Sequence, residues 1–260
     1  MNSDRANILD VQVSRFDLDE TMQQFSYAIE NGNKLRVAVT PVNCILWARK
    51  NERLKSLYNG ADIVTADGVP VVWASRLLNA PIRGRVTGLD LLPEFSAIAS
   101  KKGYRFFLLG AAEGVADQLA GTLQKQNPEL QIAGTYSPSF TETFSDSENE
   151  KMIDLINQSG ADVLWVSLTA PKQDFWIAEN FDQLNVSVAV GVGAAFDVVA
   201  GNIKRSPAWM QKAGLEWFYR LMKEPGRLSK RYLVEAPLFI PLIFKQFLTT
   251  RFLGNDSKTG

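Results

Sequence analysis

Short runs of apolar and β-branched residues recur along the whole chain, separated by segments with helical periodicity, and this alternation limits the possible folds more than any other feature. The expected strands are 8–13, 35–40, 61–66, 105–110, 130–136, 162–168 and 186–193. The expected helices are 18–32, 43–59, 89–103, 114–127, 148–159 and 171–183. The strand runs do not alternate strictly, which is typical of parallel strands with helices on both faces. We therefore predict an α/β fold with a Rossmann-like, mainly parallel sheet.

The ends of these strands carry the candidate site residues, because open α/β sheets bind ligands at the carboxyl ends of their strands. Thr40, Asp67, Gly110, Thr169 and Gly191 all fall at or just after expected strand ends. Asp67 is unusual, since it ends an apolar run and is followed at once by glycine in "TADGVPVVWASR" (65–76). Two interpretations remain open: a site carboxylate, or an acid that caps the helix beginning near Val69.

Two glycine-rich turns follow expected strands. "GVGAAFD" (191–197) offers backbone amides near a helix start, which suits phosphate, although a tight turn without a ligand has the same pattern. "GAAEGVA" (110–116) lacks the G-x-G-x-x-G spacing, so neither turn indicates NAD strongly. We assign Gly110, Gly191 and Gly193 to the nucleotide-binding edge.

The composition excludes several kinds of catalysis. The chain contains no histidine and a single cysteine, Cys44. Ser-His-Asp and Cys-His catalysis are therefore excluded, and a protein-ligated zinc site is not expected. One cysteine allows no internal disulfide and suits a reducing cytoplasm; the polar start "MNSDRANILD" has no signal-peptide pattern. Acid–base chemistry must use Asp, Glu, Lys, Tyr or water.

The C-terminal region is basic and aromatic. From residue 202 onward eleven Lys and Arg face four Asp and Glu, a balance of +7 in a chain of zero net charge. The apolar stretch "APLFIPLIF" (236–244) is shorter than the ~20 residues of a membrane-spanning helix. Basic and aromatic residues beside it favour an anionic bilayer surface, and a helical layer packed on the sheet is the alternative. Nucleic acid is a poorer candidate, because no known binding module accompanies the charge.

The arginines of this region are the candidates for binding diphosphate. Arg220, Arg227 and Arg231 lie at spacings of seven and four, which would place them on one side of a helix, although Pro225 can break the path between them. We expect three parts: an α/β core over 1–200, a helical membrane-associating appendage over 201–253 and a disordered tail over 254–260.

Several segments, in order along nearly the whole chain, resemble the WecG/TagA/CpsF glycosyltransferases (glycosyltransferase family 26). They are "VTPVN" (39–43), "ADGVPVVWASR" (66–76), "GRVTGLDLLPEF" (84–95), "FFLLGAAEGVADQLAGTLQKQNPELQIAGTYSPSF" (106–140), "WVSLTAPKQDFWI" (165–177) and "VGVGAAFDVVAGNIKRSPAWMQKAGLEWFYRLMKEPGRLSKRY" (190–232). The resemblance implies an inverting hexosyltransferase that needs neither metal nor cofactor. It implies transfer from a UDP-sugar, with a donor such as N-acetylmannosamine or glucose, to a polyprenyl-diphosphate-linked sugar. The expected location is the inner face of the bacterial plasma membrane, in cell-surface polysaccharide or teichoic-acid-type biosynthesis.

The resemblance also implies roles for single residues. Asp67 matches the family's proposed base. Matches on the donor side are Thr40 and Asn43, with one residue more between them than the usual T-x-N, and Arg85, Gln173 and Asp197. The C-terminal arginines Arg220, Arg227 and Arg231 match those thought to approach the diphosphates and the membrane. Asp174 and Ala170 replace the frequent Glu and Gly of the P-K-Q-E segment, changes that could alter donor preference.

Two other kinds of function stay open at this point, and so does a homo-oligomer. A nucleotide-sugar-modifying Rossmann enzyme would share the sheet, but it would want a dinucleotide fingerprint and a Tyr-Lys pair. A non-catalytic membrane tether of a polysaccharide assembly complex would keep the basic tail and would not need Asp67.

Overall fold

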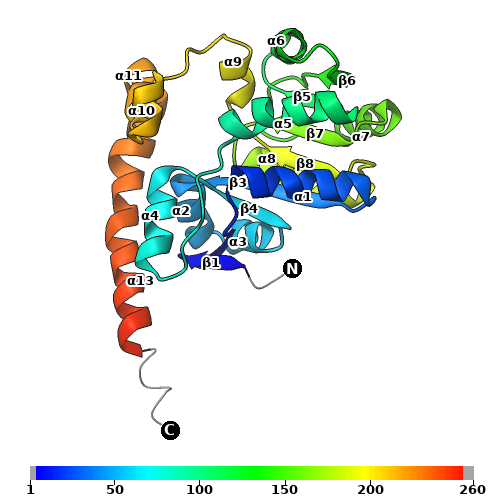
Figure 1. The fold of residues 1–260 in the computed structure, drawn as a ribbon. Helices are drawn as coiled ribbons and strands as arrows, with labels where there is room; N and C mark the ends of the chain where they lie inside the picture. The colour runs from blue at the N-terminus through cyan, green and yellow to red at the C-terminus, as the bar shows by residue number, and fades with distance from the viewer. Residues whose placement is uncertain (1–3, 254–260) are drawn as a thin grey trace.

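The computed structural model describes residues 4–253, apart from the side chains of 208, 212, 227, 252 and 253. The tail expected to be disordered, 254–260, lies outside the described residues. A central sheet of six parallel strands, in the order β4-β3-β8-β7-β5-β6, organises the molecule (Figure 1). The strands are β3 (Leu35–Pro41), β4 (Ile63–Asp67), β5 (Arg105–Gly110), β6 (Gln131–Tyr136), β7 (Val163–Ser167) and β8 (Val188–Gly191). The predicted α/β fold with a parallel sheet is confirmed.

Helices cover both faces of the sheet, because both sets of alternating strand residues are apolar. On β5, Phe106 and Leu108 join one core cluster, while Phe107 and Leu109 join another. The first face is covered by α1 (Leu18–Glu30), α5 (Gly88–Lys102) and α6 (Val115–Gln126). The second is covered by α2 (Val42–Lys50), α3 (Glu52–Asn59), α4 (Val69–Leu77), α7 (Asp146–Ser159) and α8 (Lys172–Asn180). A 3₁₀ turn, η1 (Phe181–Gln183), follows α8, and the short α9 (Ala195–Val199) follows β8.

Two predicted elements are divided in the structure. The single strand expected over 8–13 is wrong: β1 (Arg5–Ile8) and β2 (Val11–Ser14) form an antiparallel hairpin. Leu9 and Asp10 make its two-residue turn with φ of 50° and 71°, the left-handed conformation that such hairpin turns require. The helix expected over 43–59 consists of two helices, α2 and α3, which meet at Asn51. The Asn51 side chain accepts a hydrogen bond from the Leu54 amide and so caps the start of α3.

Within the described residues, the chain after α9 forms helices and connecting turns but no strand. They are α10 (Ala208–Lys212), α11 (Glu216–Lys223), α12 (Pro225–Ser229), a π-helical turn η2 (Lys230–Glu235), a 3₁₀ turn η3 (Ala236–Leu238) and α13 (Phe239–Leu253). The structure shows a break just before Pro225, since Glu224 leaves helical geometry with φ −133°. Beyond it the path is continuous, and Lys230–Arg251 is long and apolar enough to cross a membrane by length and composition. The apolar stretch 236–244 is thus one part of a longer helical segment, and this segment is consistent with peripheral association with a membrane.

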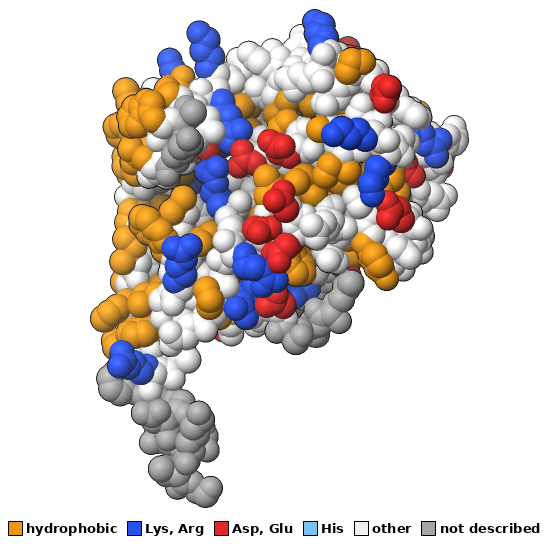
Figure 2. Space-filling model, viewed as in Figure 1, with side chains coloured by type: hydrophobic (Ala, Val, Ile, Leu, Met, Phe, Trp, Pro, Cys, Tyr) orange, Lys and Arg blue, Asp and Glu red, His pale blue; other side chains and the backbone are white. Residues whose placement is uncertain are grey.

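We call residues 202–253 the C-terminal layer; its helices run down one side of the molecule, beside α4 (Figure 1). Phe239 and Ile243 are buried in the core cluster that includes the hairpin, and the Gln246 side chain bonds the Leu9 amide and the Asn7 carbonyl. Many other apolar side chains of the layer are exposed and form an apolar band along this side (Figure 2). They include Leu215, Trp217, Phe218, Met222, Leu233, Val234, Leu238, Ile240, Phe244 and Leu248.

Candidate active site

Asp67 is the last residue of β4, at the carboxyl edge of the sheet. Its register partner on β3 is Pro41, and Thr40 pairs with Ala66. On the other side of β4, the Val86 amide donates to the Ala66 carbonyl at 3.0 Å. This bond brings the segment that carries Arg85 alongside the end of β4. Asp67 therefore stands between two chain segments at the edge where ligands bind in such sheets.

The structure excludes one of the two interpretations of Asp67, the helix cap. Helix α4 has Gly68 at its N-cap position, and no side chain makes a capping hydrogen bond there. Asp67 is thus not a capping residue. Gly68 has φ +114°, a conformation that L side chains rarely adopt, so glycine permits the abrupt turn from β4 into α4.

The electrostatic surroundings of Asp67 come from both the core and the C-terminal layer. Burial raises the pKa of the Asp67 carboxyl group to about 6. The positive charges of Arg231, Arg85 and Arg220 oppose this rise, and the negative charge of Glu216 adds to it. Residues far apart in the sequence therefore meet around one carboxylate.

The C-terminal layer comes over the start of α4. At Gly214, which has φ +72°, an added Cβ would lie 3.2 Å from the Val69 side chain, so this part of the layer packs closely on Val69. The Nε atoms of Arg220 and Arg231 are buried and have no hydrogen-bond partner among the described residues. The side chain of the third predicted arginine, Arg227, lies outside the described residues. Two guanidinium groups whose charges act on Asp67 therefore have a buried nitrogen without a partner among the described residues.

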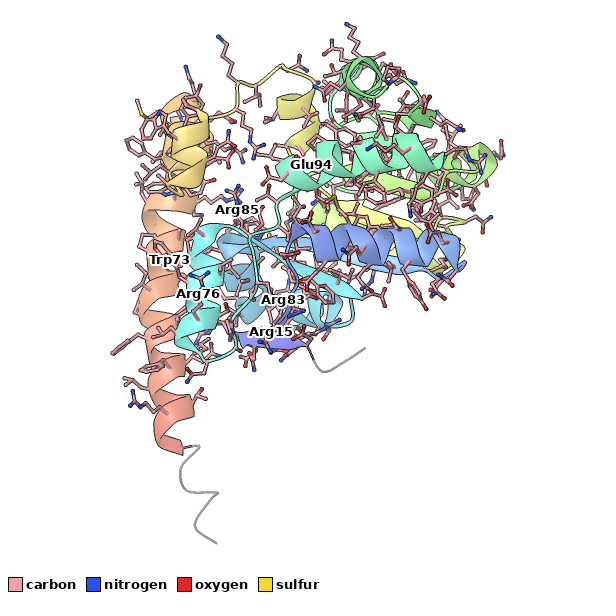
Figure 3. The ribbon with its side chains drawn as sticks, in the orientation of Figure 1. Arg15, Trp73, Arg76, Arg83, Arg85 and Glu94 are labelled. Atoms are coloured by element: carbon pink, nitrogen blue, oxygen red, sulfur yellow. The ribbon has the colours of Figure 1, made fainter. Side chains whose placement is uncertain are left out.

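Arg85 takes part in a closed set of ion pairs. It contacts Asp90 at 3.0 Å and Glu216 at 3.4 Å. Arg205 contacts the same two carboxylates, Glu216 at 3.1 Å and Asp90 at 2.5 Å. We call these four side chains the clasp; Figure 3 shows Arg85 between the core and the C-terminal layer. Sequence reasoning missed Arg205, Asp90 and Glu216, although Glu216 is one of few acids in a basic region.

Gln173 organises a second group of predicted residues at the end of β8. Its Oε1 accepts a hydrogen bond from the Gly193 amide at 3.0 Å. A Cβ at Gly191 would lie 2.7 Å from Gln173 Nε2, so glycine makes room for this side chain. The Ser167 hydroxyl donates to the Gly193 carbonyl at 2.6 Å. The structure brings Gln173, Gly191 and Gly193 together, and the Gly193 amide expected to be free for phosphate is already bonded.

The remaining predicted donor residues lie along the same edge. Thr40 is fully buried at the end of β3, and Asn43 is buried in the first turn of α2. Asp197 lies in the first turn of α9. Gly110 has a packing reason, since an added Cβ would lie 2.4 Å from the Ser167 carbonyl oxygen of the neighbouring strand.

Asp174, next to Gln173, is a second buried carboxyl group. It is 4% exposed and accepts a hydrogen bond from the Tyr58 hydroxyl at 3.1 Å. Burial raises its pKa to about 7, although the Tyr58 hydrogen bond acts in the opposite direction. Its contact with α3 makes it part of the packing behind the site.

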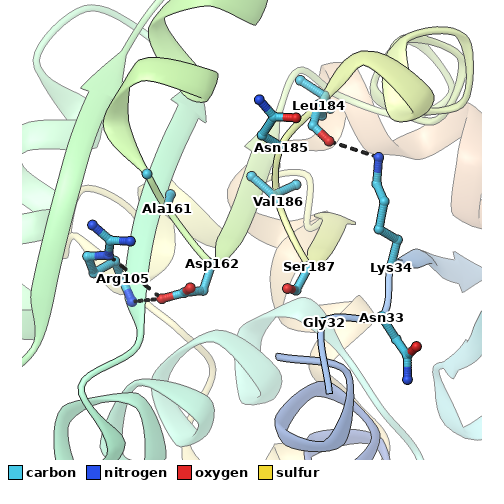
Figure 4. A pocket seen from close by; sticks show the side chains of 11 residues that line it. Gly32, Asn33, Lys34, Arg105, Ala161, Asp162, Leu184, Asn185, Val186 and Ser187 are labelled. Carbon is cyan, nitrogen blue, oxygen red and sulfur yellow. Dashed lines mark hydrogen bonds and ion pairs between the residues drawn. The ribbon is translucent and has the colours of Figure 1, made fainter. Parts of the chain in front are cut away.

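A cavity of about 330 Å³ lies at the opposite edge of the sheet (Figure 4). Its lining includes residues that precede or begin β3, β5, β7 and β8. Lys34 donates to the Leu184 carbonyl at 2.8 Å, and the Arg105 amide donates to Asp162 at 2.8 Å. This amino edge is not the edge that carries Asp67. In the described part of the chain, no three His, Cys, Asp or Glu residues gather to hold a metal ion.

Comparison with known proteins identifies the family of this chain. The model of the "Glycosyl transferase WecG/TagA/CpsF family" matches residues 6–252. A protein of Bacillus spizizenii named N-acetylglucosaminyldiphosphoundecaprenol N-acetyl-beta-D-mannosaminyltransferase is 32% identical over 76% of this chain and 74% of its own length. A protein of the same name from Staphylococcus aureus strain MW2 is 28% identical over 93% and 95%. The match spans both the sheet and the C-terminal layer, and the chain therefore belongs to the WecG/TagA/CpsF family of glycosyltransferases.

Proposed function

We propose that the protein transfers an N-acetylhexosamine or hexose from a UDP-sugar to a polyprenyl-diphosphate-linked sugar, with inversion at the anomeric carbon and without a metal ion. One observation carries this proposal: a carboxyl group with a raised pKa, Asp67, lies beside buried arginine donors that have no partner among the described residues. The names of the relatives make N-acetylmannosamine the first donor sugar to test and GlcNAc-diphosphoundecaprenol the first acceptor.

Asp67 acts as the general base. It takes the proton of an acceptor hydroxyl while that oxygen forms a bond to the anomeric carbon, and the bond from this carbon to the UDP oxygen breaks. A single displacement of this kind inverts the configuration. A base with a pKa of about 6 is mostly ionised at neutral pH and is a stronger base than an ordinary carboxylate.

Arginines stabilise the leaving group. Negative charge develops on the diphosphate of UDP as the glycosidic bond breaks, and charge-assisted hydrogen bonds from guanidinium groups match phosphate oxygens well. Arg220 and Arg231 have buried Nε donors for this role, and Arg85 adds a third positive charge near Asp67. Gln173, Thr40, Asn43 and Asp197 complete the donor side along the strand ends.

The C-terminal layer brings the enzyme to its lipid-linked acceptor. Its band of exposed apolar side chains, with lysines and arginines alongside, suits the interface of an anionic bilayer. We propose that the protein works at the cytoplasmic face of the membrane, with the layer as its contact surface.

The test is release of UDP from a panel of UDP-sugars, with a short polyprenyl-diphosphate-GlcNAc analogue as acceptor, in the presence and absence of EDTA. We expect release that depends on the acceptor, persists in EDTA and is lost in Asp67→Asn. Binding of UDP should persist in that variant, since the Asp67 carboxylate donates no hydrogen bond to the diphosphate.

A matched control is Asp154→Asn, which removes an exposed carboxylate of α7. It should retain wild-type turnover. Loss of activity in EDTA would contradict only the metal-free mechanism and would leave the proposed transfer reaction standing. Full activity of Asp67→Asn would contradict the assignment of the base, and no release with any UDP-sugar would overturn the proposed function.

A further inference from the structure

The clasp joins two parts of the chain that the backbone leaves far apart. Arg85 and Asp90 belong to the core, at the start of α5, whereas Arg205 and Glu216 belong to the C-terminal layer. Each arginine contacts both carboxylates, so that the four groups form a closed ring. Arg205 also donates to the Leu89 carbonyl at 3.4 Å, and Thr87 donates to Asp90 at 3.0 Å.

The clasp differs from the other ion pairs of the surface in its burial. Its side chains are only 13–26% exposed. The Arg83 pairs with Asp4 and Glu20, by comparison, involve side chains that are 32–41% exposed. Exposed pairs contribute little because water and salt screen them, whereas networked, partly buried pairs fix geometry more firmly. The low exposure therefore indicates a structural connection.

The position of Glu216 determines where Arg220 points. Both lie on α11, four residues apart, and side chains at this spacing share one face of a helix. Fixing Glu216 on Arg85 and Arg205 therefore turns the same face of α11, with Arg220, toward the core. Arg231 lies beyond the break at Glu224, on the helical path that starts at Pro225, and both arginines act on the Asp67 carboxylate.

We propose that the clasp positions Arg220 and Arg231 against Asp67, and that Arg205 and Glu216 are positioning residues for the transfer reaction. This inference rests on the proposed function, because it assigns the two arginines to the reacting groups. It also predicts that the clasp holds α11 and the helices after it on the core, whatever reaction the site performs.

The pH dependence of activity separates positioning from a simple charge effect. Glu216 itself raises the pKa of Asp67, so the loss of its charge alone would lower that pKa. If the clasp holds Arg220 and Arg231 in place, its loss moves two positive charges away and the pKa of Asp67 rises. If Glu216 acts only as a nearby charge, Glu216→Gln moves the acid limb of kcat/KM to lower pH. If Glu216 acts through the clasp, the same variant moves this limb to higher pH.

Arg205→Gln is the cleaner variant, because Arg205 is not among the main charges that act on the pKa of Asp67. We expect its acid limb to move up by about 1 pH unit, the smaller end of the effect of a close opposite charge. We expect kcat/KM to fall by roughly 10²-fold through misplacement of the arginines. The shifts of the two single variants should not add in Arg205→Gln/Glu216→Gln, since either one opens the same ring.

Hydrogen exchange tests the connection without any assay of activity. In Arg205→Gln, amides of α11, α12 and α13 should exchange faster, while those of β3, β5 and β7 keep wild-type rates. The matched control is Arg83→Gln, which removes an exposed, ion-paired arginine from the loop that also carries Arg85. It should change neither the exchange of these helices nor the acid limb.

The outcomes are distinct. Unchanged exchange in the C-terminal helices of both clasp variants would overturn the clasp. Faster exchange with an unmoved or lowered acid limb would overturn its link to Asp67. If the wild-type protein transfers no sugar from any UDP-sugar, the proposed function fails, and exchange alone still decides whether the clasp holds the layer.

Discussion

Asp67 shows how one residue can be tuned by opposing influences. Burial disfavours the carboxylate, and three arginines favour it, which leaves its pKa at about 6. Asp67 lies at the end of β4, and Gly68 occupies the N-cap position of α4 in its place. Charges from the C-terminal layer act on its carboxyl group. We propose that these contributions together make Asp67 a base suited to neutral pH.

The first prediction concerns this pKa. A general base works in its deprotonated form, so kcat/KM should fall about tenfold per pH unit below a midpoint near pH 6 and level off above it. Asp67→Asn should reduce turnover by roughly 10²–10⁴-fold and remove this limb. The measurement is initial rates between pH 4.5 and 8. Rates that stay constant down to pH 4.5 would show that burial does not raise the pKa of Asp67.

The second prediction concerns Asp174 and stability. Its folded pKa of about 7 lies above the unfolded value of 3.8, so the folded state binds the extra proton. The contribution of Asp174 to the free energy of unfolding therefore falls as pH rises from about 4 to 7 and is flat above. Asp174→Asn should be more stable than wild type at pH 8, by on the order of a few kcal/mol, and equal or less stable at pH 4.

Urea denaturation at pH 4 and pH 8 measures this difference. Asp154→Asn serves as the exposed control and should change the free energy of unfolding little at either pH. Equal destabilisation by Asp174→Asn at both values of pH would mean that the Tyr58 hydrogen bond, and not ionisation, dominates at this position.

At the scale of elements, the C-terminal helices show how prolines shape a path without ending it. Pro237 and Pro241 have no amide hydrogen, so the carbonyls one turn before them lose their helical partners. The wider turn η2 and the tighter turn η3 lie just before and at Pro237, where they adjust the local geometry. The resulting helix buries Phe239 and Ile243 on one side and exposes Ile240 and Phe244 on the other.

The third prediction follows from that exposed side. Ile240→Glu and Phe244→Glu should weaken binding to anionic vesicles by roughly tenfold or more each, since burying such a side chain contributes about 1.5–3 kcal/mol. Cosedimentation with vesicles measures the binding. Tyr27→Glu, which alters an exposed aromatic residue of α1, is the control. If both α13 variants bind the vesicles as the wild type does, the membrane contact lies elsewhere on the protein.

At the scale of the whole molecule, the sequence pattern predicted the features that depend on neighbouring residues, which are the strands and their ends. The apolar runs specify buried parallel strands on their own, and the position of Asp67 at a strand end follows from the same pattern. The hairpin turn at Leu9 and Asp10 was missed because "ILDVQV" satisfies a strand pattern and carries no glycine. The clasp could not be predicted, because Arg85 and Glu216 are joined by tertiary structure alone.

The bond between Gln246 and the hairpin has a consequence for how the protein is made. The Leu9 amide meets its partner 237 residues later in the chain. Because synthesis runs from the N-terminus, the hairpin leaves the ribosome well before the helix that covers it. The layer that we propose to contact the bilayer therefore completes its docking only after α13 has been made, so that the membrane-binding side of the protein forms later than the sheet on which it packs.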